Sequence, residues 1–118
     1  MNHPESDHQM ALMKWAAMAT CDYGRISDYL IAIPNGGSRN PREAARLKAE
    51  GVKAGVSDLF LAIPTADCAG LWIELKIKPN TVSKEQKAWQ ARMRAQGYAA
   101  EVAWSWTEAK DIILNYLK

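Results

Sequence analysis

The chain has 118 residues, of which 48% are hydrophobic and 24% charged, and its net charge at neutral pH is +2. This length favours one domain, residues 1–118, with a single hydrophobic core. The mixed composition excludes a globally disordered chain, and the small positive charge permits a nucleic-acid partner without predicting one.

The sequence carries no pattern typical of a disulfide framework, a zinc site, a membrane span or a signal peptide. The two cysteines, Cys21 and Cys68, have neither the number typical of a disulfide framework nor the spacing of a zinc site. No apolar run approaches the ~20 residues that span a bilayer, and the polar start MNHPESDHQ lacks the order of a signal peptide. We therefore expect a soluble intracellular protein with no membrane partner.

The first half of the chain begins with a helical pattern over residues 5–18. The apolar face of this helix would comprise Met10, Leu12, Met13, Ala16 and Ala17. Residues 21–29 have the composition of a loop, and residues 29–34 predict a short strand. Pro41 then opens a second helix that ends at Gly51, because proline suits a first helical position and glycine suits the far end.

The second half predicts three more strands and two more helices. The strands are residues 58–64, 71–77 and 98–104, and the helices are residues 84–96 and 108–118. Ser83 and Gln86 have the spacing of a capping box at the start of the first of these helices, and Thr107 caps the second. The order α-β-α-β-β-α-β-α predicts an α/β (α+β) fold, in which helices flank a small mixed β-sheet.

The strand 71–77 carries two opposite charges, Glu74 and Lys76, within an apolar run. Alternate residues of a strand share a face, so these two side chains point the same way as Trp72. The simplest interpretation is a half-buried strand whose outer face is solvated.

Asp58 favours a different interpretation. If the strand that it begins pairs antiparallel with the next one, Asp58 approaches Glu74 and Lys76. Two carboxylates beside a lysine are poorly suited to burial without a counter-ion, whereas hard oxygen ligands suit a divalent cation. The pattern is typical of metal-dependent nucleases that hold Mg²⁺.

With these residues in place, the chain resembles the virus-type replication–repair nuclease (VRR-NUC) family, a branch of the PD-(D/E)xK nucleases with a restriction-endonuclease-like core. The matching stretches, in chain order, are ESDHQ, AIPNGG, RLKAEGVKAGVSDLFLAIP, LWIELK and SKEQKAW. The likeness is to the short stand-alone members of phages and prophages rather than to the version fused to larger repair proteins, which implies the cytoplasm of a bacterial or phage-infected cell. Two departures stand out: Ser57 replaces the proline that often precedes the aspartate, and the loop IKPNT is shorter than in relatives.

The resemblance implies a Mg²⁺ or Mn²⁺ site and no organic cofactor. Its ligands would be the side chains of Asp58, Glu74 and Glu5 and the backbone carbonyl of Leu75. Gln9, four residues after Glu5, would support it by a hydrogen bond. An ordinary glutamate at a helix start is the alternative for Glu5, and Asp7 and His8 are nearby competitors for its role.

Two further residues complete the implied catalytic set. Lys76 would orient the attacking water and offset charge on the phosphate. Gln86 would reach back to the site from its helix, although its place in the capping box is an almost equally good explanation, and we expect that one side chain cannot fully serve both.

The implied substrate is branched DNA, a four-way (Holliday) junction above all, cut by a homodimer during DNA repair. Two symmetric cuts need two sites related by a two-fold axis. A flap or restriction-type nuclease and a non-catalytic DNA-binding accessory are the alternatives. The predicted DNA contacts are Asn35, Gly36, Gly37, Arg39, Lys53, Lys78, Lys84 and Lys87, within a wider basic set that also includes Arg42, Arg46 and Lys48.

Overall fold

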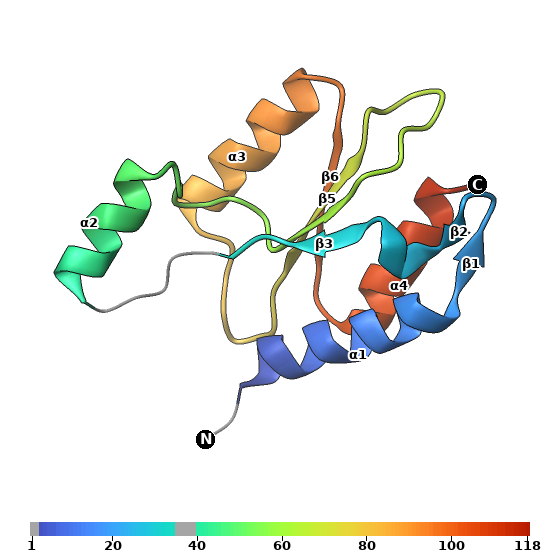
Figure 1. The fold of residues 1–118 in the computed structure, drawn as a ribbon, viewed down its shortest axis with the longest axis horizontal. Helices are drawn as coiled ribbons and strands as arrows, with labels where there is room; N and C mark the ends of the chain where they lie inside the picture. The colour runs from blue at the N-terminus through green and yellow to red at the C-terminus, as the bar shows by residue number, and fades with distance from the viewer. Residues whose placement is uncertain (1–2, 35–39) are drawn as a thin grey trace.

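A computed structural model describes residues 3–34 and 40–118. Its centre is a four-stranded sheet in the order β3-β4-β5-β6 (Figure 1). The strands are β3 (Leu30–Ala32), β4 (Leu59–Leu61), β5 (Leu71–Leu75) and β6 (Ala99–Ala103). β4 pairs antiparallel with β3 and β5, and β5 pairs parallel with β6, so the sheet is mixed as predicted.

Helices cover both faces of this sheet. α1 (Pro4–Met18) and α4 (Trp106–Tyr116) lie together over one face, where Leu12, Ile73 and Ile113 are fully buried. This face carries the main apolar core, because alternate residues of β4 and β5 point toward these helices. The other face lies under α3 (Lys84–Ala95), which packs against β5 and β6.

Aromatic side chains fill the space under α3. The ring of Trp72 lies 4.4 Å from that of Phe60 and 5.3 Å from that of Trp89, and Tyr98 completes the cluster. Aromatic pairs at these distances add to the free energy gained by burial. The face of β5 that carries Trp72 and Glu74 is therefore part of the interior.

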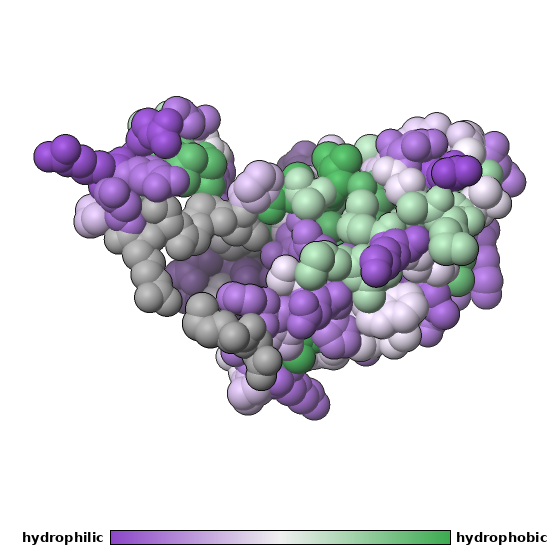
Figure 2. All heavy atoms as spheres, turned by 60° about the horizontal axis from the view of Figure 1, so that its bottom comes forward, coloured by the Kyte–Doolittle hydropathy of each residue, from purple (hydrophilic) through white to green (hydrophobic). Residues whose placement is uncertain are grey.

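α2 (Pro41–Ala49) stands apart from the rest of the molecule. It begins at Pro41 and is followed by Gly51 with a φ of +108°, as predicted. None of its residues is buried, and Figure 2 shows a mostly hydrophilic arm with a hydrophobic patch on the side toward the body. Figure 1 also shows it joined to the sheet through the segment that leads into β4.

Several predicted details were wrong. Residues 21–29 are not all loop, because β1 (Thr20–Cys21) and β2 (Gly24–Arg25) form a small antiparallel hairpin before the 3₁₀ turn η1 (Ile26–Asp28). Ser105, not Thr107, caps α4: its backbone is extended and its side chain accepts a hydrogen bond from the Glu108 N–H. Met10 is 56% exposed and so lies off the buried face of α1.

Within residues 3–34 and 40–118, no helix is both long and apolar enough to cross a bilayer.

Candidate active site

Asp58 and Glu74 meet on one face of the sheet. Leu59 pairs with Ile73 in antiparallel strands. Asp58, just before Leu59, therefore lies opposite Glu74, just after Ile73. The Leu75 N–H donates a 2.8 Å hydrogen bond to Asp58 Oδ2, which fixes the Asp58 carboxylate against the end of β5. The antiparallel pairing predicted from sequence therefore brings these acids together.

Glu74 is buried, with only 1% of its surface exposed. The interpretation of its strand face as solvated is wrong, because α3 and the aromatic cluster cover that face. Burial, and next the negative charge of Asp58, raise the pKa of Glu74 to about 9, while the nearby Lys76 ammonium works in the opposite direction. Three ionisable groups of mixed sign thus lie within electrostatic reach of one another.

This environment fits a divalent cation. Glu74 Oε1 is buried and accepts no hydrogen bond, and its ionisation is opposed by burial and by a second carboxylate. A hard cation between the two acids would satisfy both deficits at once. Asp58 and Glu74 would hold it through their carboxylates, and the Leu75 carbonyl is the further ligand that the family resemblance implies.

Gln86 serves two partners, contrary to the expectation that it could not. Its Oε1 accepts a 2.8 Å hydrogen bond from the Ser83 N–H, and the Gln86 N–H donates to Ser83 Oγ, which completes the capping box. Its Nε2 donates a 3.1 Å hydrogen bond to Glu74 Oε2. The two ends of one amide satisfy different groups, so the same side chain caps α3 and orients the buried acid.

Glu5 reaches the same end of the sheet from the start of α1. Its Oε2 accepts a 2.8 Å hydrogen bond from Asn80 Nδ2 and a 3.5 Å one from the Ile77 N–H. Its charge also contributes to the raised pKa of Glu74. Within the part of the chain that the structure describes, no three acidic, histidine or cysteine side chains are close enough to form a metal site by themselves. Direct ligation by Glu5 therefore stays a prediction.

The neighbours of Glu5 on α1 have other roles. His8 Nδ1 accepts a 3.0 Å hydrogen bond from the Trp106 N–H and so satisfies a free donor at the start of α4. Gln9 makes no hydrogen bond to Glu5 among the contacts of the described residues; it lines a shallow hollow with Met10 and Met13 instead.

Asn80 is the residue that sequence reasoning missed, since nothing in its local pattern indicates a partner 75 positions away.

Four of the predicted DNA contacts lie within the described residues. Lys53, Lys84 and Lys87 are exposed, and Lys53 lines a pocket that Gln86 also lines. Lys78 lies 5.9 Å from the centre of the Trp104 ring, a cation–π distance. Asn35, Gly36, Gly37 and Arg39 lie outside the described residues.

Comparison with known proteins decides the family. The sequence profile of the VRR-NUC domain matches residues 4–106. The chain belongs to the VRR-NUC family. A solved structure described as a VRR_NUC domain protein is similar to it with a TM-score of 0.85 and 28% identity, over 99% of this chain and 90% of the other. A search of curated proteins gave no match.

Membership in the VRR-NUC family makes this protein a member of a nuclease family and confirms the resemblance drawn from its motifs. The mixed sheet with flanking helices is the VRR-NUC nuclease fold, as predicted.

Proposed function

We propose that this VRR-NUC protein is a Mg²⁺- or Mn²⁺-dependent endonuclease that hydrolyses phosphodiester bonds in branched DNA, with the four-way junction as its preferred substrate. The observation that carries the proposal is the burial of Glu74 beside Asp58, with Lys76, just after β5, close enough to act on the pKa of Glu74. A protein that only binds DNA gains nothing from buried acids near a phosphate, whereas a hydrolase needs them to hold its cation.

Each residue of the site has a distinct task in this reaction. Asp58 and Glu74 would hold the cation through their carboxylates, and Gln86 orients the Glu74 carboxylate through the 3.1 Å hydrogen bond. The bound cation would polarise the scissile phosphate and lower the pKa of a water molecule. Lys76 orients that water and offsets the charge that develops on the phosphate oxygens. Asn80 holds Glu5 at the rim of the site.

Cleavage assays test the proposal directly. Purified protein is incubated with labelled four-way junction, flap and linear duplex, each with Mn²⁺ or with EDTA. We expect metal-dependent cutting of the junction, and its loss in Asp58→Ala and Lys76→Ala. Preference for flap or duplex would replace the junction assignment, and absence of cutting by a folded, metal-loaded protein would favour the DNA-binding accessory. Cleavage that survives EDTA would contradict the metal mechanism.

The junction assignment also requires a homodimer, since two opposed strands need two active sites related by a two-fold axis. Light scattering at micromolar concentration should give twice the 13.1 kDa chain mass. A monomeric mass would contradict symmetric junction cutting, while leaving the cleavage chemistry intact.

A further inference from the structure

The α2 arm, residues 41–49, has a hydrophobic side that no other element of the described chain covers. α2 has no buried residue, and Leu47 is its only half-buried one. Asn40 caps it through side-chain hydrogen bonds from the N–H groups of Arg42 and Glu43. A helix with one apolar side normally packs that side against the protein core or against a binding partner.

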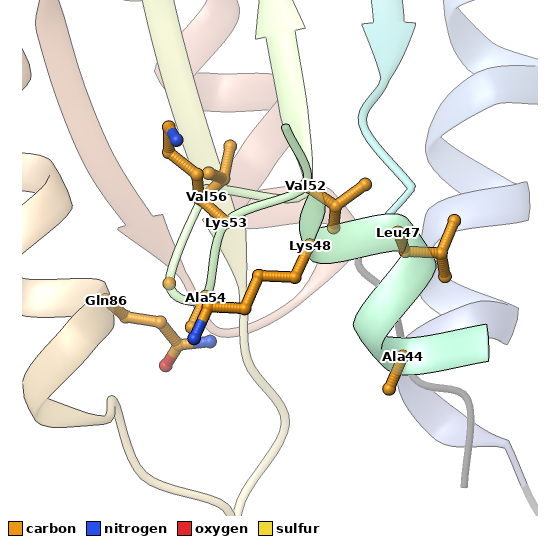
Figure 3. A pocket seen from close by; sticks show the side chains of 9 residues that line it. Ala44, Leu47, Lys48, Val52, Lys53, Ala54, Val56 and Gln86 are labelled. Atoms are coloured by element: carbon orange, nitrogen blue, oxygen red, sulfur yellow. The ribbon is translucent and has the colours of Figure 1, made fainter. Parts of the chain in front are cut away.

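A groove lies between this arm and the start of α3 (Figure 3). Its volume is about 580 Å³. Ala44, Leu47, Val52 and Val56 supply its aliphatic wall, and Lys48 and Lys53 supply its cations. Figure 3 shows Lys48 from α2 and Gln86 from α3 extending toward one another across the groove.

Gln86 connects the groove to the active site. The same side chain lines the groove and donates a hydrogen bond to Glu74. Gly55 fixes this wall: its φ is +86°, and a Cβ at this position would collide with the backbone of Glu85. Only glycine permits the segment to lie so close to the first turn of α3.

We propose that this α2 groove binds the sugar–phosphate backbone of one DNA strand next to the scissile phosphate. Lys48 and Lys53 contact its phosphates, and the aliphatic wall around Leu47 packs against the deoxyribose rings. The proposal rests on the proposed nuclease function and names where its substrate strand runs. A DNA strand fits better than an acidic protein segment, because the groove shares Gln86 with the site where the phosphate is cut.

The basic side of the groove is tested by salt dependence. Affinity for a fluorescent four-way junction is measured by anisotropy in Ca²⁺ over a range of salt concentrations. For Lys48→Ala combined with Lys53→Ala, we expect the slope of log affinity against log salt to fall by about 0.7–0.9 for each lysine. Lys14→Ala combined with Lys118→Ala removes the same charge from α1 and the chain end, and should leave the slope unchanged.

The aliphatic side is tested by Leu47→Glu, which places a carboxylate where the strand would lie. Junction affinity should fall about tenfold, equivalent to ~1.4 kcal/mol. Leu114→Glu on α4 is the control, since Leu114 is a surface leucine, 43% exposed, that lines a different hollow. Leu47 is not part of the buried core, so the melting temperature of Leu47→Glu should match that of the wild type.

The outcomes separate this proposal from the one it rests on. If the wild type binds and cuts DNA while the groove variants do so equally well, the α2 groove proposal is overturned and the nuclease function stands; an acidic protein segment then becomes the better occupant. If the wild type binds no DNA, both proposals are overturned. Selective loss of affinity and cutting in the groove variants alone supports both.

Discussion

Glu74 couples the chemistry of the site to the stability of the fold. Its carboxyl group is buried, and its pKa in the folded protein is about 9, compared with an ordinary value of 4.5. Between these two values the folded state without metal binds more protons than the unfolded state. The contribution of Glu74 to the stability of the folded state is therefore fully present below pH 4.5 and is lost as the pH rises toward 9.

We predict that metal-free protein loses stability by roughly 1 kcal/mol per pH unit between pH 5 and 8 because of Glu74. Glu74→Gln should remove most of this slope while abolishing cleavage. Mn²⁺ binds the ionised carboxylate, so the rise in melting temperature that it causes should grow with pH. Thermal melts at several pH values, with EDTA or Mn²⁺, measure both effects; equal slopes in the wild type and Glu74→Gln would refute the assignment.

Asn80 offers a second prediction at the scale of a residue. Its amide donates the shorter of the two hydrogen bonds that Glu5 accepts, at 2.8 Å. Asn80→Ala should free the Glu5 side chain and weaken Mn²⁺ binding by about 10–100-fold, the usual effect of losing a partner that orients a metal site. Calorimetric titration with Mn²⁺ measures this, with Asn115→Ala on α4 as a control. Unchanged Mn²⁺ affinity would show that Glu5 and Asn80 do not act on the cation.

Among the elements, α3 has the most direct connection to the site. Ser83 and Gln86 both cap it, but only Gln86 also contacts Glu74. We predict that Ser83→Ala and Gln86→Ala each destabilise the fold by about 1 kcal/mol, the usual cost of a lost cap, whereas only Gln86→Ala reduces the cleavage rate. Urea unfolding and single-turnover cleavage separate the two effects. A comparable loss of rate in Ser83→Ala would mean that helix capping alone accounts for the role of Gln86.

The main elements could be predicted because their signals are local. Helical spacing located α1 and α4, the Pro41 and Gly51 pair located α2, and Ser83 located the start of α3. The β1–β2 hairpin was missed because each strand has only two residues, too few to show an alternating pattern. The buried state of Glu74 also has no local signal, because it depends on α3, which begins ten residues later in the chain.

At the scale of the whole molecule, the lysines at the start of α3 lie on the surface near the site. Lys84 and Lys87 are exposed on the first turn of α3, close to Gln86. We predict that Lys84→Ala combined with Lys87→Ala lowers the salt slope of junction binding by about 0.7–0.9 for each lysine, independently of the groove lysines. Anisotropy titrations of the two pairs and of the quadruple variant would test whether their effects add. An unchanged slope would remove α3 from the DNA contacts.

The arrangement of the molecule was less predictable than its elements. Sequence reasoning placed Lys53 near the site, but not the groove, because a helix that stands away from the sheet has the same internal periodicity as one that packs on it. The pairing of Asp58 with Glu74 was predictable, since a short connection between two strands favours antiparallel neighbours.

The double attachment of Gln86 has an energetic consequence for how substrate and cation bind. A DNA strand in the α2 groove would contact the Gln86 amide, which also orients Glu74. The cation would bind the carboxylate of the same Glu74. Binding of DNA in the groove then changes the affinity of the site for the cation, and thermodynamics requires the cation to change the affinity for DNA by the same factor. DNA would raise the affinity for Mn²⁺ by the same factor as Mn²⁺ raises the affinity for DNA, and replacing Gln86 by alanine would uncouple the two binding equilibria.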